Sequence, residues 1–187
     1  MLTIDLLRHG ETTLSHTLRG STDDDLTELG WSQMQQTIDQ SLQTSLQQQA
    51  AWDVIFSSPL KRCRLFAETV AAQQHKPIFY DADLQEMHFG DWELQAWNAI
   101  PRTVLDPWMN DFVNVAVPNG ESFMDLEKRV WEFLEEKLEK PNEKPLILVT
   151  HSGVIRSVLC RINNIPLQEA FATPLDYGVV VKVEYTR

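Results

Sequence analysis

Two short polar stretches hold residue types that phosphate chemistry uses, and each follows an apolar run. Arg8 and His9 follow residues 4–7, and His151 follows residues 145–150. A guanidinium group can hold an oxyanion through two parallel hydrogen bonds, and an imidazole can attack phosphorus. A solvated turn could carry the same residues, because short patterns also arise by chance. From these residues alone, a phosphate site and a solvated turn remain alternatives.

The elements that must position these residues favour the phosphate site. Apolar runs of this length are typical of buried strands, and ligands of α/β proteins bind outside the carboxyl ends of such strands. A third run, residues 54–56, leads through Ser57 into a helix whose first turn contains Arg62. Helix N-termini themselves favour anions. Two arginines and two histidines are therefore expected to converge at one edge of a sheet.

Composition limits the class of protein. The chain has 187 residues, 43% of them hydrophobic, and a net charge of −11, which fits one domain over residues 1–187. It has no long basic run, so we expect no nucleic-acid partner, and no apolar run long enough for a membrane partner. The two cysteines, Cys63 and Cys160, are far apart and give no disulfide framework. Without a signal peptide, the expected location is the cytoplasm.

Strands and helices alternate, which predicts the α/β class: a three-layer α/β/α sandwich around a mainly parallel sheet. Strands are expected over residues 2–7, 52–56, 77–80, 145–150 and 177–185, and helices over residues 27–45, 60–74, 121–139 and 154–162. Residues 81–120 are interpreted as an insertion that covers the substrate, with short helices broken at Pro101 and Pro107. The acidic triplet 23–25 is interpreted as a solvated loop.

Six blocks in order resemble the histidine phosphatase superfamily, with its phosphoglycerate-mutase-like fold, over nearly the whole chain. They are Arg8-His9-Gly10-Glu11-Thr12, Leu26-Thr27-x-x-Gly30, Ser57-Ser58-Pro59-Leu60-x-Arg62, Leu84-x-Glu86-x-x-Phe89-Gly90-x-Trp92-Glu93, Gly120-Glu121-Ser122 and Val149-Thr150-His151. Each block alone is weak evidence, whereas six in the right order are strong evidence.

The resemblance implies a role for each matched position. His9 is the nucleophile and becomes phosphorylated, while Arg8, Arg62 and His151 hold the phosphoryl oxygens. Glu86 protonates the leaving oxygen and then deprotonates a water molecule. The nearby positive charge should lower the pKa of His9 and keep its attacking nitrogen unprotonated. This chemistry needs no metal and no cofactor, because fixed guanidinium groups neutralise the developing charge.

Further candidates for contacts with the substrate are Ser15, Ser21, Thr22, His88 and Ser152. The family commonly has an asparagine a few residues past Thr12. It is replaced here, and the nearest candidate is Ser15, whose hydroxyl can still donate to a phosphate. His88 is equally plausible as a surface residue. The pattern departs from the family again at Leu94, where many members have glycine. Trp97, Trp108 and Phe112 could cover the substrate or belong to the core, and for Trp92 we favour the core.

Residues 94–98 lack the basic segment that follows this block in phosphoglycerate mutases, which favours a phosphatase. Residues 86–93, Trp108, Asp111 and residues 118–123 resemble the α-ribazole-5′-phosphate phosphatases, which act late in assembly of the cobalamin nucleotide loop. The expected partner is thus a small phosphomonoester. A broad sugar-phosphate phosphatase, a phosphoglycerate mutase and a non-catalytic phosphate-binding module remain alternatives, and monomer and homodimer both remain open.

Overall fold

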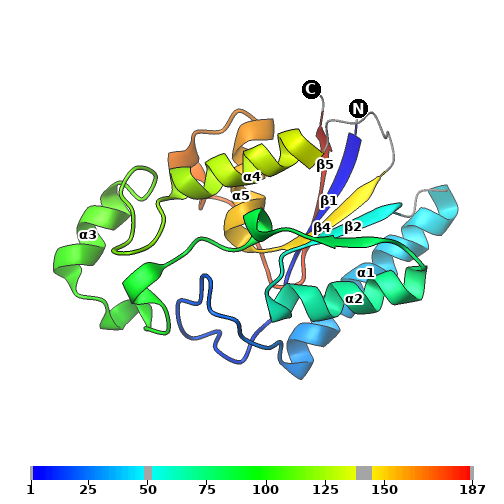
Figure 1. Cartoon of the computed structure of the whole chain (residues 1–187), viewed down its shortest axis with the longest axis horizontal. Helices are drawn as coiled ribbons and strands as arrows, with labels where there is room; N and C mark the ends of the chain where they lie inside the picture. Colours follow the sequence, from blue (N-terminus) through cyan, green and yellow to red (C-terminus); the bar gives the residue numbers. More distant parts are fainter. Residues whose placement is uncertain (1, 49–51, 138–144, 186–187) are drawn as a thin grey trace.

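The computed structural model describes residues 2–48, 52–137 and 145–185, which build a sheet between two layers of helices (Figure 1). The strands are β1 (Leu2–Arg8), β2 (Val54–Ser57), β3 (Ile78–Tyr80), β4 (Leu146–Thr150) and β5 (Val180–Tyr185). They are arranged in the order β3-β2-β4-β1-β5. All neighbouring pairs are parallel except β1 and β5, which are antiparallel. The predicted α/β fold with a mainly parallel central sheet is confirmed.

Helices cover both faces of the sheet. The α-helices are α1 (Glu28–Gln48), α2 (Lys61–Gln74), α3 (Arg102–Asn110), α4 (Phe123–Lys137) and α5 (Ser152–Ile162), and the 3-10 helices are η1 (Ala82–Leu84), η2 (Gly90–Trp92), η3 (Trp97–Ala99) and η4 (Leu167–Glu169). α1 and α2 lie on one face, and α4 and α5 lie on the other (Figure 1). α3 stands away from the sheet, at one end of the molecule. The segment between β3 and α4 therefore extends beyond the three layers.

Each face of the sheet has its own apolar layer, because side chains alternate along a buried strand. Ile4, Leu6 and Leu148 pack in the layer with α4 and α5. Leu7 and Val149 pack in the layer with α1 and α2. Both layers are closed to solvent, so the carboxyl ends of β1 and β4 are held in fixed positions.

The starts of two helices differ from the expected boundaries for local reasons. α4 begins at Phe123 rather than at residue 121, because Ser122 caps it. The Ser122 hydroxyl accepts from the Asp125 N–H, and the Asp125 carboxylate accepts from the Ser122 N–H, which is a capping box. α5 begins two residues earlier than expected, at Ser152. The expected last residues of α4, 138 and 139, lie outside the described residues.

Two expectations about helix interiors are wrong. α3 continues through Pro107 instead of breaking there. A proline inside a helix removes one N–H and crowds the carbonyl four residues before it. That carbonyl belongs to Thr103, which is exposed, so solvent can satisfy it. The helical spacing of Leu29, Met34 and Ile38 predicts one buried stripe on α1. Met34 and Ile38 are buried, whereas Leu29, in the first turn of the helix, is 55% exposed.

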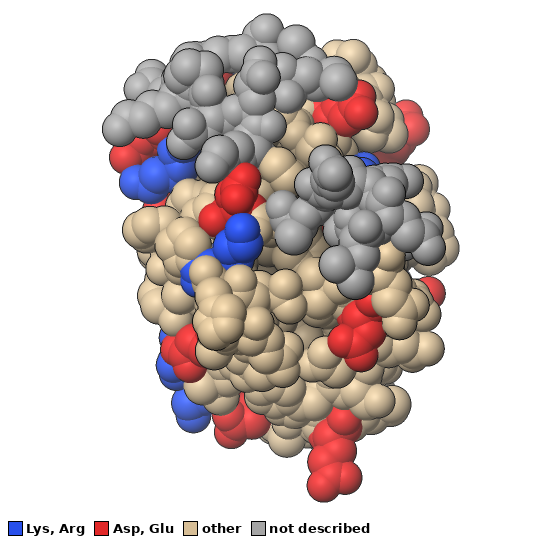
Figure 2. Space-filling view, turned by 90° about the vertical axis from the view of Figure 1, so that its right-hand side faces the viewer, with Lys and Arg blue, Asp and Glu red and all other residues tan. Residues whose placement is uncertain are grey.

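The surface is mixed in charge where Figure 2 shows it. On that face, acidic side chains are scattered among uncharged ones, and the basic side chains lie beside acidic ones. This pattern agrees with the net charge of −11. Within residues 2–48, 52–137 and 145–185, no helix has the length and apolar character needed to cross a lipid bilayer.

Candidate active site

Parallel strands bring the predicted polar residues to one edge of the sheet. β1 ends at Arg8 and leads into His9, and β4 ends at Thr150 and leads into His151. The register pairs Arg8 with Thr150, and the His9 N–H donates to the Thr150 carbonyl over 3.0 Å. The two imidazole rings therefore meet edge to face, with centroids 5.1 Å apart. β2 ends in line with them at Ser57, which leads towards the helix that carries Arg62.

His9 is buried and has a defined tautomer. Its Nδ1 lies 2.8 Å from the carbonyl oxygen of Gly10. A carbonyl oxygen can only accept, so Nδ1 carries the proton and Nε2 keeps a free lone pair. Burial, and then the charges of Arg62 and Arg8, hold the pKa of His9 well below its usual value of 6.5. The predicted lowering of this pKa is confirmed, but burial contributes more than the neighbouring charges.

His151 is also buried, and protein groups contact both ring nitrogens. Arg62 Nε donates to Nδ1 over 3.2 Å, and Ser58 Oγ lies 2.9 Å from Nε2. Since a guanidinium N–H can only donate, Nδ1 is the acceptor and Nε2 carries the proton. Burial and the charge of Arg62 hold the pKa of His151 well below its usual value. His151 is therefore a fixed, neutral group beside His9.

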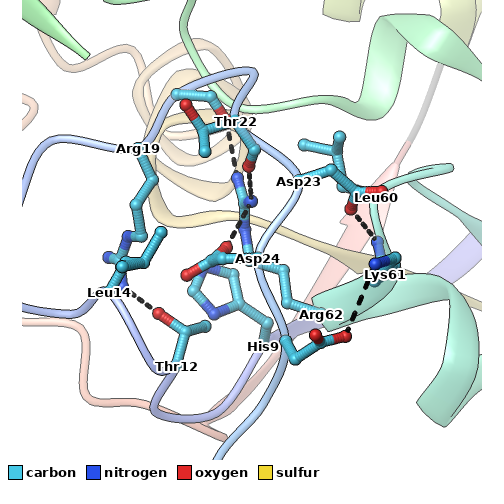
Figure 3. Close-up of polar contacts among 12 residues, drawn as sticks. His9, Thr12, Leu14, Arg19, Thr22, Asp23, Asp24, Leu60, Lys61 and Arg62 are labelled. Carbon is cyan, nitrogen blue, oxygen red and sulfur yellow. Dashed lines mark hydrogen bonds and ion pairs between the residues drawn. The ribbon is translucent and has the colours of Figure 1, made fainter. Parts of the chain in front are cut away.

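Arg62, in the first turn of α2, is 1% exposed and is already held by the protein (Figure 3). Its acceptors are His151 Nδ1, the carbonyls of Thr22 and Gly20 at 2.6 Å each, and Asp24 Oδ1 at 2.9 Å. A guanidinium has five N–H groups. These four contacts leave one N–H of Arg62 for a ligand.

Asp24 corrects the interpretation of residues 23–25 as a solvated loop. Asp24 is 4% exposed, and its ion pair with Arg62 is buried on both sides. A buried guanidinium is costly without a buried counter-charge, and Asp24 supplies that charge. Asp23 is exposed but caps α2, because its carboxylate accepts from the Lys61 N–H over 2.7 Å. The acidic loop therefore fixes both Arg62 and the helix that carries it.

Arg19 belongs to this site, although its sequence context did not single it out. Its Nη1 donates to the hydroxyl of Thr12 (Figure 3), and its Nη2 donates to the hydroxyl of Tyr177 over 3.2 Å. The ring of Tyr177 lies 5.8 Å from that of His9, and the charge of Arg19 lowers the pKa of both His9 and His151. The sequence offered one signal for this role: Arg19 is an arginine between the first block and the acidic loop, in a chain with a net charge of −11.

Arg8 packs on the ring face of Tyr177, whose hydroxyl binds Arg19. Its Nη1 donates to the Leu175 carbonyl, and its Cζ lies 4.1 Å from the centroid of the Tyr177 ring. Its Nε is buried and has no hydrogen-bond partner among the described residues. Burial lowers the pKa of the Arg8 guanidinium. Arg8 therefore retains donors that an oxyanion could use.

Glu86 reaches the site from the segment that follows η1. Its Oε2 accepts from the Gly153 N–H over 3.1 Å, and its Oε1 accepts from the Met87 N–H over 2.9 Å. Gly153 lies in the first turn of α5, where a negative charge is favoured. A methyl group on Gly153 would lie 2.1 Å from Glu86 Oε1, so glycine is required for this approach. The charge of Glu86 raises the pKa of the Arg8 guanidinium, which burial lowers.

Arg129, on α4, holds the backbone that carries Glu86. It donates to the carbonyls of Asp83, Gln85 and Glu86 over 2.6–3.0 Å. Its Nε also pairs with Glu121 over 2.8 Å. Sequence reasoning missed this role, because nothing in the helical pattern of α4 shows which distant carbonyls an arginine will bind.

Glu93 binds two of the weaker candidates. Ser21 Oγ and Thr22 Oγ1 both donate to its carboxylate, Ser21 over 2.9 Å. The Ser21 and Phe89 N–H groups donate to the same carboxylate over 2.7 and 3.2 Å. The side chain of His88 is 46% exposed, with Nε2 3.8 Å from Glu93 Oε1. These contacts join the loop after β1 to the segment after Glu86.

The two departures from the family pattern have different consequences. Ser15 is exposed in a turn closed by its own N–H on the Thr12 carbonyl, and the hydrogen bonds of the described residues do not join its hydroxyl to His9 or Arg62. Leu94 has φ +65°, the left-handed conformation that favours glycine. Leu94 thus has a conformation that glycine adopts without strain and that costs a leucine about 1–2 kcal/mol.

An apolar cleft of about 460 Å³ adjoins the polar groups. It is lined by Phe89, Trp97, Trp108, Met109, Phe112 and Phe171. A narrower hollow that contains Glu86 and Ser152 shares four of these aromatic residues. Trp97 is 47% exposed at the cleft, whereas Trp92 is 4% exposed and belongs to the core, as predicted. The cleft and the Glu86 carboxylate are therefore parts of one continuous site.

Protein groups supply the charges of this site. In the part of the chain that the structure describes, no three His, Cys, Asp or Glu side chains are grouped to hold a metal ion. The cations beside the two histidines are the guanidinium groups of Arg8, Arg19 and Arg62. The arrangement can bind an oxyanion, present an imidazole lone pair to it, and exchange a proton at a nearby carboxylate.

The sequence comparison agrees with this geometry. The model of the histidine phosphatase superfamily (branch 1) matches residues 4–187. The chain therefore belongs to the histidine phosphatase superfamily. It is an enzyme of this superfamily, a phosphatase of the metal-independent kind, as the resemblance of its six blocks implied.

Among its relatives, an adenosylcobalamin/alpha-ribazole phosphatase of Salmonella typhimurium is 30% identical over 178 residues, which cover 92% of this chain and 85% of the relative. The uncharacterized phosphatase PhoE of Bacillus subtilis is 29% identical over 165 residues, with coverages of 87% and 78%. The crystal structure of the alpha-ribazole phosphatase from Shigella flexneri superposes with a TM-score of 0.84 at 26% identity, over 100% of this chain and 92% of that chain.

Proposed function

We propose that this enzyme hydrolyses phosphomonoesters through a phosphohistidine at Nε2 of His9. In the first step Nε2 attacks phosphorus, the bond to the ester oxygen breaks, and Glu86 protonates the leaving oxygen. In the second step a water molecule attacks phosphorus and gives its proton to the Glu86 carboxylate. The phosphorus–nitrogen bond then breaks, which releases inorganic phosphate and restores His9.

The tautomer and low pKa of His9 support this sequence of steps. The Nδ1 proton is bound to the Gly10 carbonyl at 2.8 Å, so the lone pair needed for attack is on Nε2. Arg8 and Arg62 are proposed to bind the phosphoryl oxygens. His151 is proposed to bind them too, by turning its Nε2 proton from Ser58 Oγ to a phosphoryl oxygen. Phosphoryl transfer depends chiefly on positioning and on neutralising charge, and both come from groups held at the ends of buried strands or at the start of α2.

We propose α-ribazole 5′-phosphate, a phosphorylated benzimidazole riboside, as the substrate, in assembly of the cobalamin nucleotide loop. The observation that carries this choice is the aromatic cleft of about 460 Å³ beside Glu86. A planar aromatic ring can pack against Trp97 and Phe171 while its phosphate lies near His9. Similarity to the Salmonella typhimurium and Shigella flexneri proteins supports the same choice.

The alternative substrates are sugar phosphates and phosphoglycerate, the latter through a mutase reaction. Their hydroxyl and carboxylate groups need polar partners, whereas the lining of the cleft is aromatic apart from Met109.

We also propose a cytoplasmic enzyme, which is supported by Cys63 and Cys160 being free thiols that are both buried.

A panel of substrates tests the proposal. It contains α-ribazole 5′-phosphate, 3-phosphoglycerate, fructose phosphates and mononucleotides, each assayed with EDTA present. We expect the highest kcat/KM for α-ribazole 5′-phosphate and no activity towards any substrate for His9→Ala, which also controls for contaminating phosphatases. A higher kcat/KM for 3-phosphoglycerate or a fructose phosphate would overturn the substrate, and an active His9→Ala would overturn the mechanism.

A further inference from the structure

Tyr177 precedes β5 and contacts three groups of the candidate site, although the proposed reaction gives it no role. Its ring centroid lies 5.8 Å from that of His9. Its face lies 4.1 Å from Cζ of Arg8, and its hydroxyl accepts from Arg19 Nη2 over 3.2 Å. One side chain thus joins the proposed nucleophile to two guanidinium groups that come from different parts of the chain.

The balance of charge makes these two guanidinium groups important. Arg62 is paired with Asp24, and both side chains are 1% exposed, so the charge of Arg62 is compensated inside the protein. Among the described residues, Arg8 and Arg19 form no ion pair with a carboxylate within 4.0 Å, although the charges of Glu86 and Asp176 act on Arg8 from a greater distance. A phosphate dianion needs two positive charges that other groups have not already neutralised. Arg8 and Arg19 are the pair that can supply them.

Arg8 and Arg19 both contact Tyr177 and carry the same charge, so they need a group that stabilises both. The charge of Arg19 lowers the pKa of Arg8, so the two guanidinium groups repel each other. Tyr177 offers a different surface to each: the electron-rich face of its ring to Arg8 and the lone pair of its hydroxyl oxygen to Arg19. A purely aliphatic side chain could do neither.

We propose that Tyr177 is a positioning residue that holds Arg8 and Arg19 side by side, so that together they bind the charged oxygens of the phosphoryl group. This inference rests on the proposed phosphatase function and deepens it. Tyr177 acts through the two arginines and transfers no proton itself. Its hydroxyl fixes Arg19, and its ring fixes Arg8.

Tyr177→Phe tests the hydroxyl, because it keeps the ring that supports Arg8. The dissociation constant of inorganic phosphate is measured by titration calorimetry, and KM and kcat are measured with p-nitrophenyl phosphate. We expect the dissociation constant and KM to rise about three- to tenfold, and kcat to change by less than about twofold. Tyr80→Phe is the matched control, because the Tyr80 hydroxyl binds Glu68, outside this site, and should leave all three constants unchanged.

A double-mutant cycle separates positioning from a general structural effect. Arg19→Gln should weaken phosphate binding by about tenfold or more, and Tyr177→Phe should add little in that background, because its partner is gone. An unchanged dissociation constant in Tyr177→Phe, or the same loss with and without Arg19, would overturn the inference. Calorimetry measures phosphate binding without turnover, so the cycle decides the role of Tyr177 whether or not the enzyme is a phosphatase. A wild-type protein that binds phosphate but forms no phosphohistidine would overturn the proposed function alone.

Discussion

The two ends of the candidate substrate site are built in different ways. At the phosphate end, His9, Arg62 and His151 are at most 3% exposed, and they lie at strand ends or at a helix start. At the aromatic end, Trp97 and Phe171 are 47% and 53% exposed, and they come from short helices and loops. The phosphate end carries out the reaction, which needs groups fixed to within a fraction of an ångström. The aromatic end selects the substrate, which adaptable segments can do.

This contrast makes the effects of substitutions predictable. A change at the phosphate end should lower turnover for every phosphomonoester, because each substrate presents the same phosphoryl group. A change at the aromatic end should act only on substrates with a large apolar part. The predictions below test this division, from the largest expected effect to the smallest.

Among the predictions below, Glu86→Gln should have the largest effect, because it removes the proton that the leaving oxygen takes. We expect kcat for alkyl phosphates to fall about 10²- to 10⁴-fold, while the inhibition constant of inorganic phosphate changes little. Steady-state kinetics check both values. Glu68→Gln, the same change on the exposed surface of α2, should be neutral. Equal losses of turnover and phosphate binding would assign Glu86 to binding instead.

Gly153→Ala tests whether the first turn of α5 sets the position of Glu86. The added methyl group would lie 2.1 Å from Glu86 Oε1 and would displace the carboxylate. We expect kcat to fall about 10- to 100-fold for all substrates, since small misplacements of reacting groups are costly. Thermal unfolding measured alongside would show whether the fold survives. Full activity in a folded variant would contradict the proposed position of the acid.

Trp97→Ala tests the aromatic end. We expect KM for α-ribazole 5′-phosphate to rise about tenfold, because the variant loses an aromatic contact, whereas kcat/KM for a small alkyl phosphate should not change. Phe79→Ala, at an aromatic residue on β3 that is similarly exposed, is the control and should alter neither value. Equal losses for both substrates would mean that the cleft does not select the substrate.

The buried histidines predict a modest pH dependence of stability. The pKa values of His9 and His151 lie well below 6.5 in the folded state, so the unfolded chain binds more protons below that pH. The free energy of unfolding should therefore fall as the pH is lowered below 6.5, and the slope should be smaller in His9→Gln. Urea unfolding at several pH values checks both. Identical slopes for wild type and variant would contradict the burial of a neutral His9.

The phosphate end could be predicted from the sequence because it depends on local pattern and topology. Apolar runs before Arg8-His9 and before His151 indicated two buried strands, and parallel pairing of such strands brings their ends together. The helix start after β2 placed Arg62 in the same way. The positions of Arg8, His9, Arg62 and His151 follow from the order of strands and helices along the chain, and the hydrophobic pattern of the sequence predicts that order.

The remaining contacts depend on how distant loops fold onto the sheet. Asp24 reads as one residue of an acidic loop, and only the tertiary structure shows it buried against Arg62. Arg19 and Tyr177 are 158 residues apart along the chain, and no spacing rule connects them. The path of α3 through Pro107 likewise depends on whether a single carbonyl is exposed. Local preferences do not contain this information.

The central claim is that His9 Nε2 carries the phosphoryl group during turnover, and trapping that group tests it most directly. p-Nitrophenolate leaves without protonation, so Glu86→Gln should still form the intermediate from p-nitrophenyl phosphate but hydrolyse it slowly. After an alkaline quench, peptide mass spectrometry should find one acid-labile phosphoryl group, on His9. It should be absent from the Glu86→Gln/His9→Ala double variant. A phosphoryl group on any other residue, or one that persists without His9, would contradict the account.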